Sequence, residues 1–372
     1  MKIGVNARLL TKPFTGIGQH TKNLFGELAR LDSENEYTLV VPGEVDEDIF
    51  KSFPENVKIK VLKERKIGTA GMKKTWWEQI SVPEFFEKEK VDIAFFPYPS
   101  NPWTKDWYKK GIKTFVTVHD CVPWTRKEYR KGFASKMYHS QTKKAVKLAD
   151  IVFTVSEVSK KDIIDICGID KNKIKVIYND ADIVYKEKIS EDYKIKVLEK
   201  FNLKGKKFFL YVGGYDERKN VSYLLEEYAE YDGEAGLVLA GGKLFDKKLY
   251  NSYEKKIQGQ NVVRTGFLKE KELAVLYQNC SSFVNFSRQE GFNIPILEAA
   301  NCGAPLILSD IEVHKEIADD AAVFVDTDKK GGGVEALKKV FRHQKEFSKK
   351  AEKLAEKYSW KKSANKIIDV IN

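Results

Sequence analysis

Residues 282–303 hold the pattern that says most about the fold, and they read SFVNFSRQEGFNIPILEAANCG. A short apolar run comes first and a loop follows it. Pro295 then stands where a helix can begin, because proline needs no amide partner in the first turn. Gly303 is typical of a helix end. The segment therefore predicts a strand, a loop and a short helix, with Glu290 on the loop and Glu298 in the first helical turns.

The start of this predicted helix is suited to an anion. Its unpaired backbone amides favour a negatively charged group such as a diphosphate. Carboxylates such as Glu290 and Glu298 accept hydrogen bonds from hydroxyl groups, which sugars and ribose supply. The segment thus predicts a site for a nucleotide sugar.

Outward from this segment, short apolar runs alternate with helix-like stretches along most of the chain. The stretch Gln19–Leu31, for example, repeats leucine at the spacing of one helix face. This alternation predicts parallel sheets covered by helices, an α/β fold. The first series of expected strands is Lys2–Asn6, Tyr37–Val41, Ile59–Leu62, Ile93–Phe96, Thr114–His119 and Val152–Ser156. The second is Phe208–Val212, Gly236–Leu239, Val262–Thr265, Ser282–Phe286, Leu306–Leu308 and Val323–Val325. Two consecutive series predict two Rossmann-like domains.

Length and composition agree with a soluble two-domain protein. The 372 residues exceed one ordinary domain, and 42% of them are hydrophobic. No apolar run reaches eighteen residues, and the first residues run directly into an expected strand, so we expect neither a membrane span nor a signal peptide. The cysteines lack a C-x-x-C spacing, which argues against zinc and disulfides. We therefore expect a cytoplasmic protein.

Positive charge is concentrated in residues 101–150, with twelve Lys or Arg against four Asp or Glu, within a net charge of +11. A solvated helical face explains this simply. Attraction to an anionic membrane surface or to a phosphorylated acceptor is the alternative. We expect no nucleic-acid partner, because no recognition motif accompanies the charge.

The carboxylates Glu290 and Glu298, with seven residues between them, resemble the E-x7-E signature of family 4 glycosyltransferases. These are retaining enzymes of the GT-B fold, with two Rossmann-like domains and a cleft between them. The resemblance implies transfer of a sugar from a nucleoside diphosphate donor without a metal cofactor. The acceptor would be a glycan or lipid-linked molecule of cell-surface polysaccharide synthesis. Mannose from GDP-mannose is the donor we expect first.

The resemblance also suggests domain boundaries. An acceptor-binding domain would span residues 1–182, a linker 183–205, and a donor-binding domain 206–358. In the family the last helix, here 359–372, packs back on the first domain, and Ser359 can cap it. The linker contains one expected helix, at Glu191–Phe201.

A second expected donor site follows the strand Phe208–Val212. Adjacent cations after a glycine turn, Arg218 and Lys219, can neutralise a diphosphate. In the family an arginine often follows the glycine directly, where this chain has Gly214. We therefore expect Lys219 to bind the diphosphate and leave the role of Arg218 open.

Further donor contacts are implied by the resemblance alone. The amides of Asn293 and Ile294 would bind the diphosphate, Glu298 the ribose and Glu290 the sugar hydroxyls. The backbone of the turn at Phe267 and Leu268 would meet the base. Glycine is usual at position 293, so the asparagine side chain there is expected to affect the choice of donor.

Four residues of the first domain are candidates for the cleft. Gly16 and Gly18 open an expected helix after the first strand, and they let a backbone approach a ligand closely. His119 ends a predicted parallel strand, where α/β sheets bind ligands. Ser156 is an expected helix cap, and in the family its position faces the cleft. The resemblance gives His119 a hydrogen bond to the transferred sugar and gives the others contacts with the acceptor.

Some patterns have simpler structural explanations. Asp180 and Asp182 form a D-x-D pair, which can hold a metal ion, but a structural role is favoured because the pair lies between the domains. Trp76 and Trp77 belong to an aromatic helix that is better explained as core than as a membrane anchor.

A sugar-nucleotide epimerase of the same fold and a noncatalytic sugar-nucleotide-binding protein remain alternative functions.

Overall fold

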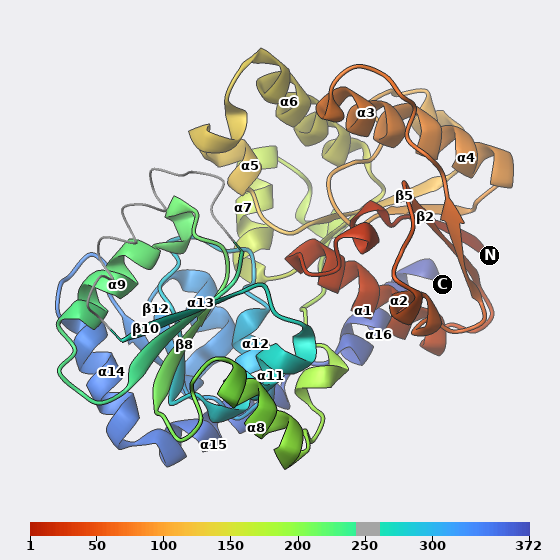
Figure 1. The fold of residues 1–372 in the computed structure, drawn as a ribbon. Coiled ribbons are helices and arrows are strands. Elements are labelled where there is room, and N and C mark those ends of the chain that lie inside the picture. Colours follow the sequence, from red (N-terminus) through yellow and green to blue (C-terminus); the bar gives the residue numbers. More distant parts are fainter. Residues whose placement is uncertain (243–260) are drawn as a thin grey trace. The chain divides into compact units, whose positions relative to one another are not determined.

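The computed structural model describes residues 1–242 and 261–372, which form two compact units (Figure 1). The first comprises Met1–Asn179 together with Ser359–Asn372, and the second comprises Asp180–Tyr358. Each unit contains one parallel sheet with helices packed against it, so the predicted α/β class with two Rossmann-like sheets is confirmed.

The sheet of the first unit has the order β3-β2-β1-β4-β5-β6-β7, with every pair parallel. Val5 lies opposite both Leu39 and Phe95, which sets the register at the centre of the sheet. The order changes direction at β1 and β4, and ligands of such sheets bind beyond the carboxyl ends of the strands at this point. The strands are β1 Lys2–Asn6, β2 Glu36–Val41, β3 Val57–Val61, β4 Ile93–Phe96, β5 Lys113–Val118, β6 Ile151–Thr154 and β7 Ile174–Val176.

Both faces of this sheet are buried, which explains why its strands read as nearly continuous apolar runs. Phe95 belongs to the core on one face, and its neighbours Ala94 and Phe96 belong to the core on the other. The helices of the unit are α1 Gly16–Leu31, α2 Glu47–Lys51, α3 Ala70–Trp76, α4 Val82–Glu89, α5 Val122–Thr125, α6 Phe133–Leu148, α7 Glu157–Cys167 and α16 Trp360–Ile371.

Helix α16 completes the first unit, although 179 residues of the second unit precede it in the chain. It packs along α1 (Figure 1). Ile367 and Ile371 are buried in the same core as the strands of β1 and β2. Ser359 caps the helix by accepting a hydrogen bond from the amide of Lys361, as its sequence position predicts.

The second unit has the sheet order β10-β9-β8-β11-β12-β13, again with every pair parallel. Here the order changes direction at β8 and β11. The strands are β8 Phe208–Val212, β9 Gly236–Ala240, β10 Val262–Gly266, β11 Ser282–Asn285, β12 Leu306–Ser309 and β13 Ala322–Val325. Among its described residues, the α-helices are α8 Glu191–Lys200, α9 Val221–Ala229, α11 Glu270–Asn279, α12 Pro295–Asn301, α13 Glu312–Ala318, α14 Gly332–Arg342 and α15 Gln344–Ala355.

The stretch 183–205, expected to be a linker, lies within the second unit. Its helix α8 forms where the sequence predicts one, and it packs on α11. An ion pair of 2.6 Å between Lys200 and Glu272 joins the two helices. The crossing between the units therefore falls at residues 179 and 180, not across a free segment.

Burial shows the place of the aromatic helix that contains Trp76 and Trp77. Trp77 is fully buried in the core of the first unit, and its indole nitrogen donates to the carbonyl of Leu62, so it is a core residue as the sequence favours. Trp76 is exposed on its surface. Within residues 1–242 and 261–372, no helix has the length and apolar character needed to cross a membrane.

Candidate functional site

The loops after β8 and β11 form the candidate site of the second unit. These strands are neighbours, with Phe283 opposite Leu210, so their following loops leave the same edge of the sheet. The change in strand order places a ligand site at this edge. The two loops are joined by a backbone hydrogen bond of 2.9 Å from the amide of Arg288 to the carbonyl of Arg218.

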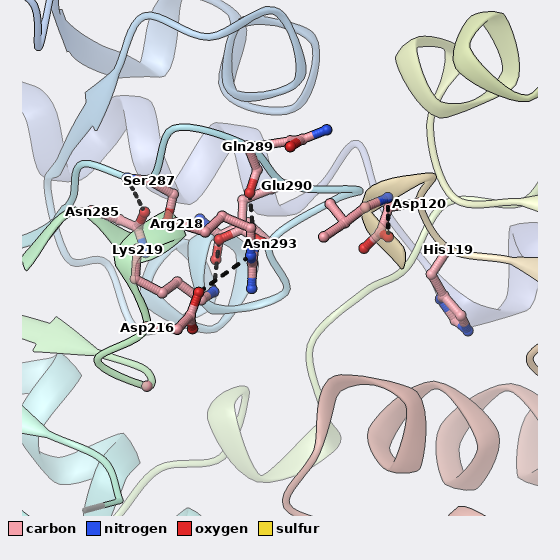
Figure 2. Close-up of polar contacts among 12 residues, drawn as sticks. His119, Asp120, Asp216, Arg218, Lys219, Asn285, Ser287, Gln289, Glu290 and Asn293 are labelled. Atoms are coloured by element: carbon pink, nitrogen blue, oxygen red, sulfur yellow. Dashed lines mark hydrogen bonds and ion pairs between the residues drawn. The ribbon is translucent and has the colours of Figure 1, made fainter. Parts of the chain in front are cut away.

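Glu290 lies between two cations (Figure 2). Its two carboxylate oxygens accept hydrogen bonds from different residues, 2.5 Å from Nη1 of Arg218 and 2.6 Å from Nζ of Lys219. Nη1 of Arg218 also donates to the carbonyl of Gln289 at 2.7 Å. The Glu290 side chain is only 8% exposed. Two residues from the β8 loop thus position a carboxylate from the β11 loop. Lys219 and Glu290 are seventy-one positions apart in the sequence.

These cations fix the charge of Glu290. Burial would raise the pKa of its carboxyl, but Lys219 and Arg218 outweigh burial and lower this pKa to about 2. The group is therefore ionised throughout the physiological range. A carboxylate with such a low pKa is a weak base, so Glu290 can accept hydrogen bonds but is poorly suited to removing a proton from a substrate.

The start of α12 lies next to this arrangement. Pro295 occupies its first position, as predicted, and Gly303 ends it with a φ of 71°. The amides of Asn293 and Ile294 have no hydrogen-bond partner within residues 1–242 and 261–372. Arg218, Lys219 and these amides are the groups near this point that can bind an anion.

Glu298 lies in the interior of the second unit. Its Oε2 accepts a hydrogen bond of 2.9 Å from the hydroxyl of Tyr277. Burial raises the pKa of its carboxyl to about 8, despite the hydrogen bonds from Tyr277 and Tyr185. At neutral pH it is therefore largely protonated, unlike Glu290. The two carboxylates of one motif have different charge states.

Other predicted donor residues lie at the same edge. Gly214 is exposed, and its carbonyl accepts a hydrogen bond of 2.5 Å from the hydroxyl of Tyr211. A side chain there would meet only Asp216, at an ordinary contact distance. Phe267 is 70% exposed after the edge strand β10, and Leu268 is partly buried.

The first unit has its own set of candidate residues after β5. His119 places Nε2 at 2.8 Å from the carbonyl of Pro97, which requires a hydrogen on that nitrogen. Burial lowers the pKa of His119 to about 4, so its ring is neutral at physiological pH. Nδ1 consequently carries a lone pair. Ser156 caps α7 by accepting from the amide of Ser159, whose hydroxyl in turn donates to the carbonyl of His119.

His20 was not singled out from the sequence. It lies on α1, two residues after Gly18, and its ring meets that of His119 edge to face at 4.6 Å. Its Nδ1 is 2.7 Å from Oδ1 of Asn179, and its ring also contacts Trp360. No sequence pattern identifies His20 as a site residue, because a histidine within an amphipathic helix has no characteristic spacing. The structure places it between His119 and the two points where the chain passes between the units.

The D-x-D pair has a structural role. Asp180 is buried and paired with Lys186 at 2.5 Å, and Asp182 caps a short helical turn through the amide of Val184. Across residues 1–242 and 261–372, no three His, Cys, Asp or Glu side chains are grouped so that they could hold a metal ion.

Two family profiles match the chain, one for each half. Residues 192–361 match "Glycosyl transferases group 1", and residues 14–183 match "Glycosyltransferase Family 4". The chain belongs to these glycosyltransferase families. The first matched segment contains the Arg218, Lys219 and Glu290 arrangement, and the second contains His119.

Among curated proteins, O-antigen chain mannosyltransferase RfbU of Salmonella typhimurium is 30% identical over 235 residues, 60% of each chain. O-antigen chain mannosyltransferase B of Escherichia coli is 29% identical over 190 residues, 48% of each chain. These matches span about half to three fifths of the length of the curated relatives.

Solved structures share the fold at low sequence identity. WaaG, a glycosyltransferase involved in lipopolysaccharide biosynthesis, matches with a TM-score of 0.78 and 14% identity over all of both chains. Anabaena Alr3699/HepE, solved in complex with UDP and glucose, matches with a TM-score of 0.74 and 16% identity over 100% of this chain and 99% of its own. The expected GT-B fold is confirmed.

Proposed function

We propose that this chain transfers a sugar from a nucleoside diphosphate donor to a glycan or lipid-linked acceptor, with retention at the anomeric carbon. The observation that supports the proposal most directly is the arrangement of Arg218, Lys219 and Glu290 beside the start of α12. Cations and unpaired amides suit a diphosphate, and an ionised carboxylate suits sugar hydroxyls. Family membership supports the same reaction.

The fixed positive charge would act on the departing group. When the bond between sugar and diphosphate breaks, negative charge grows on the diphosphate. Arg218 and Lys219 are held in place by Glu290, so they stabilise that charge without rearranging much. Such a contact lowers the barrier because it strengthens in the transition state. Since these side chains already supply positive charge, we propose that no divalent metal is needed.

A group other than Glu290 must take the proton from the attacking hydroxyl of the acceptor. The low pKa of Glu290 makes it a weak base, and the resembled family offers the leaving phosphate itself as the proton acceptor. We therefore assign Glu290 to the sugar hydroxyls. We assign His119 to a sugar hydroxyl as well, because its neutral ring offers Nδ1 as an acceptor.

Mannose from a guanosine diphosphate donor is the sugar we propose. Two of the curated relatives, RfbU and mannosyltransferase B, are named O-antigen chain mannosyltransferases, which supports both mannose and a bacterial surface polysaccharide as product. The expected base contact at Phe267 and Leu268 is made by backbone, so these side chains are not what distinguishes guanine from uracil. Alr3699/HepE was solved with UDP.

We further propose that the first unit, which we expect to bind the acceptor, binds to an anionic membrane surface. Phe133 is 83% exposed at the start of α6, and Tyr129 and Met137 are exposed on either side of it. Basic residues surround them in the sequence, including Lys131 and Lys136. Exposed apolar side chains among cations match the interfacial region of a bilayer. Vesicles with and without anionic lipid should separate the wild type from a Phe133→Ser variant by co-sedimentation, and equal binding of the two would exclude this surface.

Calorimetry with GDP, UDP, ADP and dTDP tests the donor site. Wild type should bind one of them, and Lys219→Ala should weaken this binding by about tenfold or more, since a buried charge-assisted contact to phosphate is lost. Lys338→Ala is the matched control, because Lys338 pairs with Asp232 on the surface of the same unit. Unchanged affinity in Lys219→Ala would remove Lys219 from the site.

Product analysis separates the alternative functions. With donor and no acceptor, an epimerase would change the sugar nucleotide, whereas a slow transferase would release free sugar and nucleotide. A binding protein would do neither. Glu290→Gln keeps the shape of the side chain but loses its charge, so it should bind nucleotide and lose most of the hydrolysis or transfer. Full activity of this variant would contradict the role given to Glu290.

A further inference from the structure

Asn293 adopts a backbone conformation that favours glycine. Its φ is 78°, in the left-handed region, where a side chain is rarely accommodated. The residue is also 93% buried, between the loop of Glu290 and the start of α12. A strained, buried polar side chain at the candidate site indicates that the side chain has a use there.

A chain of hydrogen bonds determines how the Asn293 amide is turned. It starts at Ser309, whose hydroxyl donates to the carbonyl of Ser287 at 2.5 Å. That hydroxyl has only one hydrogen, so its oxygen can only accept from His314, whose Nδ1 lies 3.0 Å away. Nδ1 is also 3.1 Å from the carbonyl of Ser309, which is an acceptor. Both contacts therefore require the hydrogen of His314 to be on Nδ1.

The other ring nitrogen of His314 must then be an acceptor. Burial lowers the pKa of His314 to about 4, so the ring carries only one hydrogen at neutral pH. Nε2 lies 3.0 Å from the amide nitrogen of Asn293, and this contact is a hydrogen bond donated by Asn293. The amide is thus held with its nitrogen toward His314 and its oxygen elsewhere.

The oxygen of the same amide is left without a donor. Oδ1 of Asn293 is fully enclosed, and no hydrogen-bond donor reaches it within residues 1–242 and 261–372. A buried acceptor in this state is costly unless a ligand supplies the hydrogen. Both Glu290 and Lys219 are close enough to His314 to influence its pKa, so this oxygen belongs to the candidate donor site.

We propose that Oδ1 of Asn293 accepts a hydrogen bond from one hydroxyl of the donor's sugar ring and so selects the donor. This proposal rests on the function proposed above. A carbonyl oxygen cannot donate, so it cannot bind the diphosphate, whose oxygens are acceptors at neutral pH. It recognises an atom that carries hydrogen, and it disfavours a donor that is deoxygenated at that position. His314 acts as the positioning residue.

The Asn293→Gly variant tests this assignment. Glycine suits the backbone conformation, so the variant should fold. Calorimetry would compare a nucleoside diphosphate with its sugar conjugate, using GDP with GDP-mannose and UDP with UDP-glucose. We expect the nucleoside diphosphate to bind the variant as it binds wild type, and the sugar conjugate to bind about threefold to tenfold more weakly.

Monodeoxy analogues of the bound sugar identify the hydroxyl. Wild type should bind one analogue more weakly than the complete sugar conjugate, by the same threefold to tenfold factor. Asn293→Gly should bind that analogue and the complete sugar conjugate with the same affinity. Suppose that wild type binds a nucleotide sugar, and that the variant binds the same sugar conjugate and each analogue with the affinity of wild type. The role of Asn293 is then overturned, while the proposed function stands. If wild type binds no nucleotide sugar, both fall.

The hydrogen-bond chain has a direct test without any ligand. Nitrogen NMR of the labelled protein distinguishes the two neutral forms of His314. The hydrogen should be on Nδ1. A hydrogen on Nε2 would require the Asn293 amide to be turned the other way, with its oxygen satisfied by His314, and would overturn the proposal.

Discussion

Two glutamates eight positions apart differ in charge because their neighbours differ. Glu290 faces Arg218 and Lys219, whereas Glu298 faces the hydroxyl of Tyr277 in the interior. The pKa of the first is lowered to about 2 and that of the second is raised to about 8. Spacing in a sequence shows that two carboxylates are present, but the charge on each depends on residues from other elements.

Glu298 should make stability depend on pH. Its folded pKa of about 8 lies above the value near 4.5 of an unfolded chain, so its favourable contribution is complete below pH 4.5 and is lost as the pH rises through 8. Glu298→Gln keeps a neutral side chain and the contact with Tyr277. Relative to this variant, wild type should lose roughly 2–4 kcal/mol of unfolding free energy between pH 5 and pH 8.5.

Urea denaturation of both proteins at each pH measures this difference. Groups that titrate in both proteins cancel when the two curves are subtracted. A difference that does not change with pH would show that Glu298 is already ionised in the folded chain.

Among the elements, helix α1 has two glycines in its first turn, and its start depends on Gly18 more than on Gly16. A side-chain carbon at Gly18 would lie 2.5 Å from the carbonyl oxygen of Lys12 and 2.9 Å from that of Leu9. Both are backbone atoms and cannot move aside easily. Gly18→Ala should therefore lower the free energy of unfolding by about 1–3 kcal/mol. Thermal unfolding measures the loss.

Gly16→Ala is the control for this prediction. Nothing lies within 4 Å of a side-chain carbon at Gly16, and alanine favours a helix, so the substitution should change stability by less than about 1 kcal/mol in either direction. Equal effects of the two substitutions would show that close packing is not what requires glycine at position 18.

The elements were largely predictable, and the contacts between them were not. Most strands lie within one or two residues of their predicted positions, because buried parallel strands are continuous apolar runs. Strand β7, Ile174–Val176, was missed, since its three residues are too short for a recognisable pattern. The pairing of Asn293 with His314 could not be predicted either, because it depends on how α13 packs.

At the scale of the whole molecule, the first unit depends on α16. Trp360, Ile367 and Ile371 share a core with α1 and the central strands. Removing residues 359–372 should destabilise the first unit and leave nucleotide binding by the second unchanged. Calorimetric unfolding and nucleotide titration of the shortened chain measure the two effects.

Ile367→Ala is a milder version of the same test. Burial of this side chain is complete, so the substitution should cost about 2–5 kcal/mol. If the first unit unfolded at the same temperature with and without α16, the helix would not be part of its core.

The position of α16 in the chain also affects how the protein is made on the ribosome. Residues 1–179 emerge first, but the helix that covers α1 follows only after the second unit has been synthesised. At a typical elongation rate this interval lasts about 10–40 s. During that time the apolar face of α1 is uncovered, because the helix that packs on it has not yet been made. The nascent first unit is consequently the part of this protein that a chaperone would be expected to bind.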